Sequence, residues 1–215
     1  MMRHAMRHPS SLIRRPSNPR LHGRRVMLRP LEVHDFAAWR DVRLANEDWL
    51  LPWEPIRPAG IADPTRDRAA FESRCAARER ERSSDYAYPF GLFVDQQFVG
   101  EVNINNVTRG ALQGATIGYW IDRARAGQAY IAEAVVVVLQ FAFEQLQLHR
   151  IEICIVPRNT NSRRVVEKLE LRCEGLAERF LEIAGTWEDH LRFAITIEEW
   201  MERADELSAR WISAE

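Results

Sequence analysis

Hydrophobic and polar residues follow two different periods along this chain, and the period changes many times. An apolar residue at every second position, or a short apolar run, predicts a strand, whereas apolar residues three or four positions apart predict a helix. The strand pattern covers residues 24–30, 88–95, 97–107, 115–121, 150–156, 178–183 and 190–197. The helical pattern covers residues 33–43, 65–82, 128–148, 161–169 and 197–213.

Single residues indicate how some of these helices begin and end. Asp35 is placed to cap the helix that follows it, and Asn161 or Ser162 to cap the helix that runs through Leu169. Two prolines exclude a regular helix between residues 50 and 55.

The order of the elements predicts one domain of mixed helices and strands, of the α/β (α+β) class. Antiparallel strands up to Ile121 come first, a strand–helix–strand unit follows, and a hairpin around Ala184-Gly185 comes last. A helical crossover makes its two strands, 115–121 and 150–156, parallel neighbours in the simplest topology. We therefore expect a mixed, mostly antiparallel twisted sheet flanked by helices, with one central parallel pair of strands.

Composition bounds the number of domains and the class of protein. With 215 residues, 46% of them hydrophobic, residues 24–215 are expected to form one packed domain. Residues 1–23 are basic and carry no acid, so we expect a disordered tail there. A net charge of −1 gives no support to direct nucleic-acid binding. No apolar run is long enough to predict a membrane span.

The three cysteines lack C-x-x-C spacing and are an odd number. They predict neither a disulfide framework nor a zinc site, and we expect reduced thiols in a cytoplasmic protein. Nearly all basic residues are arginines, because Lys168 is the single lysine of the chain.

The segment from residue 115 to residue 148 reads as a strand, a turn and a helix, and the turn has the features of an anion site. A helix start directs backbone N–H groups and the positive end of the helix dipole at such a turn, which suits a phosphate. Arg123 and Arg125 add positive charge. The turn matches neither G-x-x-x-x-G-K-[ST] nor the spaced glycines of a dinucleotide fold. Read locally, a glycine turn that opens a helix is also common without any phosphate.

Several segments, in this order, resemble one enzyme family. They are LRPLEVHDFAAW (28–39), WLLPWEP (49–55), NNVTRGALQGATIGYWID (105–122), LHRIEICIVPRNTNSRRVVEKL (148–169) and EGLAERFLEIAGTWEDHLRFAITIEEW (174–200). From about Arg24 to Trp200 the chain resembles the GNAT superfamily of N-acetyltransferases, and more narrowly the RimJ/RimL-type ribosomal-protein N-terminal acetyltransferases. It departs from the family at two places. The first position of the loop motif Q/R-x-x-G-x-G/A is Ala124, and the usual L-G-F reads Leu169-Glu170-Leu171.

The resemblance implies a GNAT fold that binds acetyl-CoA at the parallel strand pair, without a metal. The last three residues of strand 115–121 would pair with the pantetheine arm, and the backbone amides from Arg125 to Tyr130 would hold the pyrophosphate. Asn159 would lie near the pantetheine, and Ser162 near the thioester sulfur as proton donor to the CoA thiolate. Read locally, Ser162 is a helix cap. The residues expected to bind the cofactor are Tyr119, Trp120, Ile121, Arg123, Arg125, Ala126, Gly127, Gln128, Ala129, Tyr130, Asn159 and Ser162.

The same resemblance makes Glu101 the candidate general base, with a structural carboxylate as the alternative. Glu101 is expected on the polar face of strand 97–107, because Phe98, Gly100, Val102 and Ile104 alternate with Val99, Glu101, Asn103 and Asn105. A strong base is not required for an α-amine, since its pKa of about 7.7–8.0 leaves roughly a tenth of it neutral at pH 7.

The acceptor is expected at a loop that two prolines make rigid. Trp49 and Trp53 would wall the acceptor cleft, or would simply cover the core. The leading hypothesis is transfer to the α-amine of a protein N-terminus, for instance of a ribosomal protein, by a monomer or homodimer. Two other hypotheses stay open: a small-molecule amine as acceptor, and a non-catalytic acyl-CoA-binding module.

Overall fold

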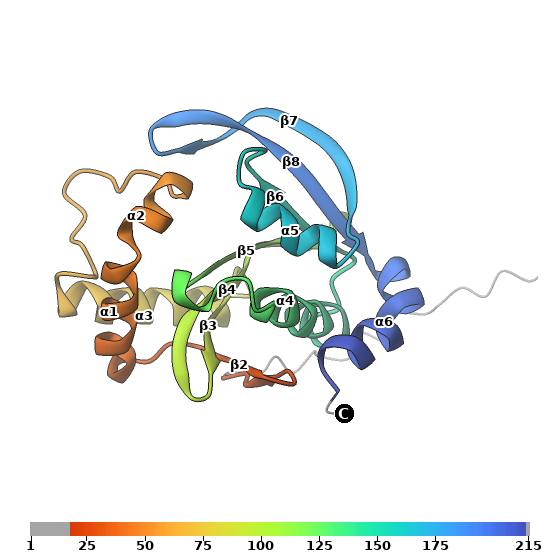
Figure 1. Cartoon of the computed structure of the whole chain (residues 1–215), viewed down its shortest axis with the longest axis horizontal. Coiled ribbons are helices and arrows are strands. Elements are labelled where there is room, and N and C mark those ends of the chain that lie inside the picture. Colours follow the sequence, from red (N-terminus) through yellow and green to blue (C-terminus); the bar gives the residue numbers. More distant parts are fainter. Residues whose placement is uncertain (1–17, 214–215) are drawn as a thin grey trace, which may run out of the picture.

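The computed structural model describes residues 18–213, in which eight strands form one twisted sheet with helices on both faces (Figure 1). The strands are β1 (Leu21–His22), β2 (Val26–Arg29), β3 (Tyr88–Val94), β4 (Gln97–Thr108), β5 (Gly114–Ile121), β6 (Arg150–Ile155), β7 (Arg172–Ile183) and β8 (Thr186–Thr196). The α-helices are α1 (Phe36–Ala45), α2 (Glu47–Leu50), α3 (Arg68–Ser83), α4 (Tyr130–Gln140), α5 (Thr160–Lys168) and α6 (Ile197–Trp211). Short 3-10 helices are η1 (Val33–Asp35), η2 (Leu51–Trp53) and η3 (Arg123–Arg125), and α4 continues into a π-helix, η4 (Phe141–Gln145).

The strand order is β1-β2-β3-β4-β5-β6-β8-β7, which confirms the predicted mixed sheet. Strands β5 and β6 are parallel, as the crossover through α4 predicts, but they pair at three positions only, from Gly114↔Arg150 to Thr116↔Glu152. Beyond these positions β5 continues to Ile121 without pairing to β6. The two strands separate toward their C-terminal ends, and the sheet opens there.

Two apolar cores lie on opposite faces of the sheet. One surrounds α4, whose residues are buried on all sides from Tyr130 to Leu139. We expected α4 to bury a single face, but α5 and α6 pack against the side that the sheet leaves uncovered. On the other face, α1 and α3 contribute Trp39 and Phe71 to a smaller core.

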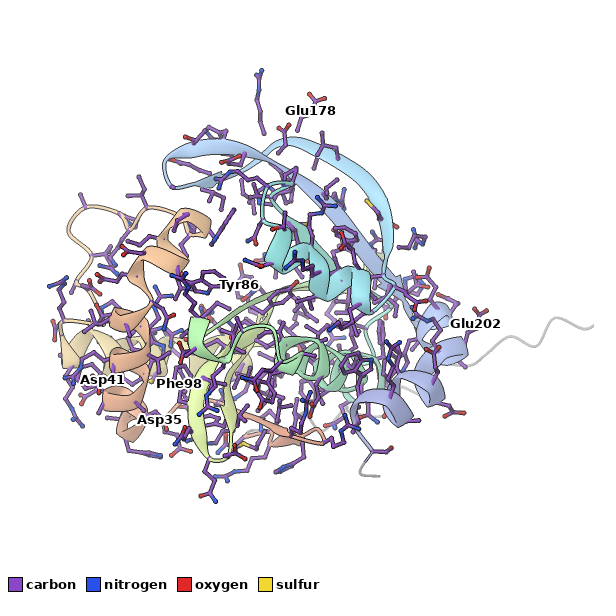
Figure 2. All side chains as sticks on the ribbon, in the orientation of Figure 1. Asp35, Asp41, Tyr86, Phe98, Glu178 and Glu202 are labelled. Carbon is purple, nitrogen blue, oxygen red and sulfur yellow. The ribbon has the colours of Figure 1, made fainter. Side chains whose placement is uncertain are left out.

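A bulge in β4 makes the predicted alternation wrong at Phe98 and Val99, while it holds from Gly100 to Asn105. The register between β3 and β4 shifts between Leu92 and Phe93, so Val99 is an extra residue on β4. As a result Phe98 packs on the side of α1 and α3 (Figure 2), whereas Val99 and Val102 pack in the core around α4.

Two predicted helix caps are also wrong. Asp35 precedes α1, but its carboxylate pairs with Arg29 (2.7 Å) and makes no capping bond to α1. Helix α5 is capped by Asn159, whose Oδ1 accepts a hydrogen bond from Ser162 N (3.1 Å), and not by Asn161 or Ser162.

The β7–β8 hairpin is longer than predicted, and its tip reaches the segment after α2 (Figure 1). The amide of Ala184 donates to the carbonyl of Glu54 (2.9 Å). A Cβ atom added to Gly185 would lie 2.9 Å from the side chain of Ile56, so the tip packs tightly there. We call this contact between the hairpin tip and residues 54–56 the arch.

The N-terminal boundary lies earlier than the sequence pattern indicates. Leu21–His22 forms β1 and pairs with β2, so the folded part begins before residue 24, while residues 1–17 of the predicted tail lie outside the described residues. Within residues 18–213, no helix has the length and apolar character needed to cross a bilayer. Over the same range, no cluster of three or more His, Cys, Asp or Glu side chains is arranged to hold a metal ion.

Candidate functional site

A cavity of about 510 Å³ lies where β5 and β6 separate, and residues on both faces of the sheet line it. Tyr119 and Trp120 both line it, although successive strand residues point to opposite faces. The hydroxyl of Tyr119 donates to the carbonyl of Ser162 on α5 (2.9 Å). Trp120 packs against Phe98 on the side of α1, with ring centroids 5.7 Å apart. The cavity therefore passes through the sheet, from an α4 end at the start of α4 to an α2 end beside α2 and η2.

Main chain forms much of the α4 end. Gly127 (φ +80°) and Ala129 (φ +64°) carry the chain through the left-handed region, which glycine adopts freely. The first hydrogen bond of α4 joins Glu133 N to Ala129 O (3.1 Å), so the amides of residues 130–132 precede the helical ladder. Gly127, Ala129 and residues 130–132 line the cavity. This geometry suits the binding of an anion.

The predicted amide cradle is shifted along the chain. The amides of Arg125 and Ala126 donate to the carbonyls of Asp122 (2.9 Å) and Arg123 (3.2 Å) inside η3, so they are already used. The cavity is lined by residues from both sides of Gln128 but not by Gln128 itself.

The two arginines of the turn have different surroundings. Arg125 lines the cavity, whereas the guanidinium of Arg123 lies 5.6 Å from the ring centroid of Trp49. Further positive charge comes from α5, where Arg164 and Lys168 also line the cavity. The sequence carries a signal for this pair, because residues four apart share one face of a helix.

Asn159 and Ser162 lie together at the wall between the two ends. Ser162 belongs to the first turn of α5, which Asn159 caps, so the local interpretation of Ser162 as a cap is wrong. Burial raises the pKa of Tyr119, because a buried phenolate is poorly solvated. Tyr119 therefore stays protonated and holds the main chain of Ser162. The role of Ser162 as proton donor stays a prediction.

Trp49 and Trp53 both line the α2 end. The indole N–H of Trp49 donates to the carbonyl of Ile121 at the end of β5 (3.2 Å), so this carbonyl is engaged by the protein. The guanidinium of Arg158 lies 4.7 Å from the ring centroid of Trp53. Both rings are thus fixed by polar partners from other segments, and acceptor binding by them stays a prediction.

Glu54 also lines the α2 end, and the sequence analysis missed it. Both carboxylate oxygens of Glu54 accept from Arg43 (2.6 and 2.7 Å), whose guanidinium lies over Trp120 (5.2 Å). The carbonyl of Glu54 accepts from Ala184 in the arch. Only tertiary contacts identify this residue, since the motif WLLPWEP gives it no partner.

Glu101 was predicted on a polar face of the sheet. In the structure α1 and α3 cover it, and 2% of its surface is exposed. It accepts hydrogen bonds from Trp39 Nε1 (2.7 Å) and Arg74 Nη2 (2.7 Å). Burial alone would raise the pKa of Glu101, but the charge of Arg74 and these hydrogen bonds outweigh burial and lower it. It lines a separate cavity of about 740 Å³ between α3 and the sheet. A carboxylate so engaged is a weak proton acceptor.

Comparisons with known proteins agree with this geometry. Residues 25–172 match the family described as acetyltransferase (GNAT) domain. The chain is 37% identical to the probable N-acetyltransferase YjcK of Bacillus subtilis, over 81% of this chain and 96% of that protein. It is 30% identical to the [ribosomal protein uS5]-alanine N-acetyltransferase of Escherichia coli, over 78% of this chain and 87% of that protein.

A solved structure extends the likeness to the fold. Mycobacterium smegmatis RimJ in complex with CoA-disulfide superposes with a TM-score of 0.80 and 38% sequence identity, over 90% of this chain and 93% of that one. Family, relatives and structure agree along most of the chain. The chain belongs to the GNAT acetyltransferase family, as an N-acetyltransferase of the RimJ/RimL type.

Proposed function

We propose that this protein transfers the acetyl group of acetyl-CoA to the α-amine of a protein N-terminus, with ribosomal proteins as the first acceptors to test. The cavity that passes through the sheet carries the proposal, because a donor and an acceptor can meet in it from opposite faces. The Escherichia coli relative acts on an alanine of ribosomal protein uS5, and the Mycobacterium smegmatis relative was solved with a CoA-disulfide.

The donor enters at the α4 end. Amides of residues 130–132, together with the side chains of Arg125, Arg164 and Lys168, would bind its pyrophosphate. The pantetheine arm would run along β5 beyond Thr116, where β5 no longer pairs with β6 and its main chain is available to amides of the arm. This path brings the thioester to the wall that carries Ser162.

The transfer exchanges one bond for another and moves two protons. The amine nitrogen attacks the thioester carbonyl carbon, so that a C–N bond forms and the C–S bond breaks. The nitrogen loses a proton to solvent, and the CoA thiolate takes one from the hydroxyl of Ser162, the proposed donor, which regains a proton from solvent. Tyr119 supports this step by fixing the main chain of Ser162 (2.9 Å).

The proton of the amine is proposed to leave through water rather than to Glu101. Glu101 is held by Arg74 and Trp39, and its pKa is lowered. An α-amine needs little help, because its pKa is close to neutral pH, whereas the amine of a lysine, with a pKa of about 10.4, is almost fully charged. We place the enzyme in the cytoplasm, in keeping with the free cysteines of the described residues.

A matched set of acceptors tests the proposal. One peptide carries a free N-terminal alanine, a second carries the same sequence with a blocked N-terminus and an internal lysine, and a polyamine represents small amines. Mass spectrometry should show acetyl-CoA-dependent acetylation of the first peptide only. Acetylation of the blocked peptide or of the polyamine with similar kcat/KM would overturn the α-amine assignment.

A further inference from the structure

Helix α4 contains one charged residue, Glu133, and its side chain is completely buried. The other buried residues of this helix are apolar or aromatic. A buried carboxylate is costly unless charges and hydrogen bonds compensate it, so its partners show what it is for.

The partners of Glu133 come from the chain just before β2. Oε1 accepts from the amides of Arg25 (2.5 Å) and Val26 (3.1 Å), and Oε2 accepts from Arg25 Nε (2.8 Å). A Cβ atom added to Gly23 would lie 2.8 Å from Glu133 Oε1, so only glycine allows this close approach. The start of β2 thus wraps around the carboxylate.

Arg25 also reaches the turn at the α4 end of the cavity. Its Nη1 donates to the carbonyl of Gln128 (3.2 Å), and its guanidinium lies 4.9 Å from the ring centroid of Tyr130. Gln128 and Tyr130 flank Ala129, which is held at a φ of +64° that an alanine disfavours. One side chain therefore links the buried carboxylate to both neighbours of the strained residue.

We propose that Arg25 and Glu133 form a clamp that holds residues 127–130 in the conformation that binds the cofactor pyrophosphate. The clamp rests on the proposed acetyl-CoA site. Glu133 fixes the guanidinium of Arg25, and the guanidinium fixes the carbonyl of Gln128 and the ring of Tyr130. With this carbonyl held by Arg25, the amides that follow face the cavity. Arg25 and Glu133 are positioning residues, and neither takes part in the transfer.

The clamp predicts a loss that depends on the phosphates of the ligand. Arg25→Ala should weaken CoA binding about tenfold, because the turn no longer holds its amides in place. The kcat/KM for S-acetylpantetheine, which lacks the pyrophosphate, should stay unchanged. A merely structural role would lower both activities together.

Arg109→Ala is the matched control. Arg109 pairs with the buried Asp85 (2.7 Å) and donates to the carbonyl of Leu146 (2.7 Å), so it makes the same kinds of bond at the far end of the same helical segment. This variant should lower Tm to a similar degree and leave the affinity for CoA unchanged. If Arg25→Ala does not fold, Arg25→Lys replaces it, since a lysine keeps the charge beside Glu133 but cannot also bind Gln128.

The experiment is titration calorimetry with CoA on the full chain, followed by kinetics with acetyl-CoA and S-acetylpantetheine. Weaker CoA binding in Arg25→Ala or Arg25→Lys, with unchanged activity on S-acetylpantetheine, supports the clamp. If the wild-type protein binds CoA and the Arg25 variants bind it equally well, the clamp alone is overturned. If the wild-type protein does not bind CoA, the proposed function and the clamp both fall.

Discussion

The two ends of the cavity are constructed differently. The α4 end is largely one continuous segment, residues 125–132, in which the backbone amides of residues 130–132 precede the helical ladder. The α2 end joins segments that are distant in sequence: residues 49–54, Arg158, and through the arch the turn at Ala184. On the proposed function, donor recognition therefore depends on local structure, and acceptor recognition depends on tertiary packing.

This difference indicates which end can change independently. The main-chain part of the α4 end tolerates many side chains, so on the proposed function sequence change there should affect the donor mainly at the few charged side chains that line or hold the turn. An end assembled from loops can alter its acceptor when one loop changes. The five predictions below test whether the two ends act separately.

The largest effect on stability is expected for Glu101. It lies opposite Trp120 in the pairing of β4 with β5, next to the α2 end. Glu101→Gln removes the charge that holds Arg74 and should lower the free energy of unfolding by about 3 kcal/mol, because it leaves a partly buried charge without its partner. Urea denaturation measures the loss. An unchanged free energy of unfolding would show that this ion pair does not support the site.

The effect of Glu101 should depend on pH. Its pKa in the folded protein is lowered below the ordinary value of 4.5, so its stabilising contribution is fully present above that value and is lost as the pH falls through the folded pKa. The difference in stability between wild type and Glu101→Gln should therefore shrink in acid. A difference that stayed constant from neutral pH into acid would contradict the lowered pKa.

The next effect is expected between the two ends, at Ser162. Ser162→Ala should lower kcat about a hundredfold and leave the KM for acetyl-CoA unchanged, because the hydroxyl acts on the leaving thiolate. Tm should hardly change, since Asn159 and not Ser162 caps α5. Ser162→Thr, which keeps a hydroxyl, is the control. Full turnover by the alanine variant would remove Ser162 from the mechanism.

At the α4 end, Gly127→Val should raise the Kd for CoA about tenfold, because a β-branched residue resists a φ of +80° and distorts the turn. Gly110→Val is the control: Gly110 has a φ of +73°, and a Cβ atom at either glycine meets nothing within 4 Å. Both variants carry the same backbone strain, but only the first should affect CoA. If calorimetry gave both variants the same affinity for CoA, the turn at Gly127 would have no role in binding the cofactor.

The smallest effect is expected at the α2 end. Glu54→Gln weakens the partly buried pair with Arg43 and should raise the KM for a peptide acceptor a few-fold, in line with the modest energy of such pairs. The KM for acetyl-CoA should not change. If both KM values rose together, the two ends would not be independent, and the comparison between them would fail.

The sequence pattern predicted the features that depend on residues close to one another in the chain. The order of strands and helices, the parallel pair β5–β6 and the glycine turn before α4 all follow from period and turn chemistry.

What the pattern missed depends on contacts between distant segments. Glu101 alternates with apolar residues and so resembles a solvent-facing strand residue, but α1 and α3 cover it. No feature of the sequence indicates the bulge at Val99. The position of Glu54 at the α2 end depends on a contact between its carbonyl and the tip of the β7–β8 hairpin. Asn159 caps α5 because its carboxamide lies one turn before the amide of Ser162. The sequence does not show which polar residue of the run Asn159–Ser162 is the cap.

The separation of β5 and β6 also gives the sheet two edges in its interior. Edges with unpaired N–H and C=O groups invite pairing with another chain, and proteins usually shield them. Here the Trp49 indole engages the last carbonyl of β5, and the arch borders the α2 side. The same elements that shape the α2 end, the proposed acceptor site, would thus also protect the protein against edge-to-edge aggregation. Selection on solubility and selection on acceptor choice would act on the same few residues.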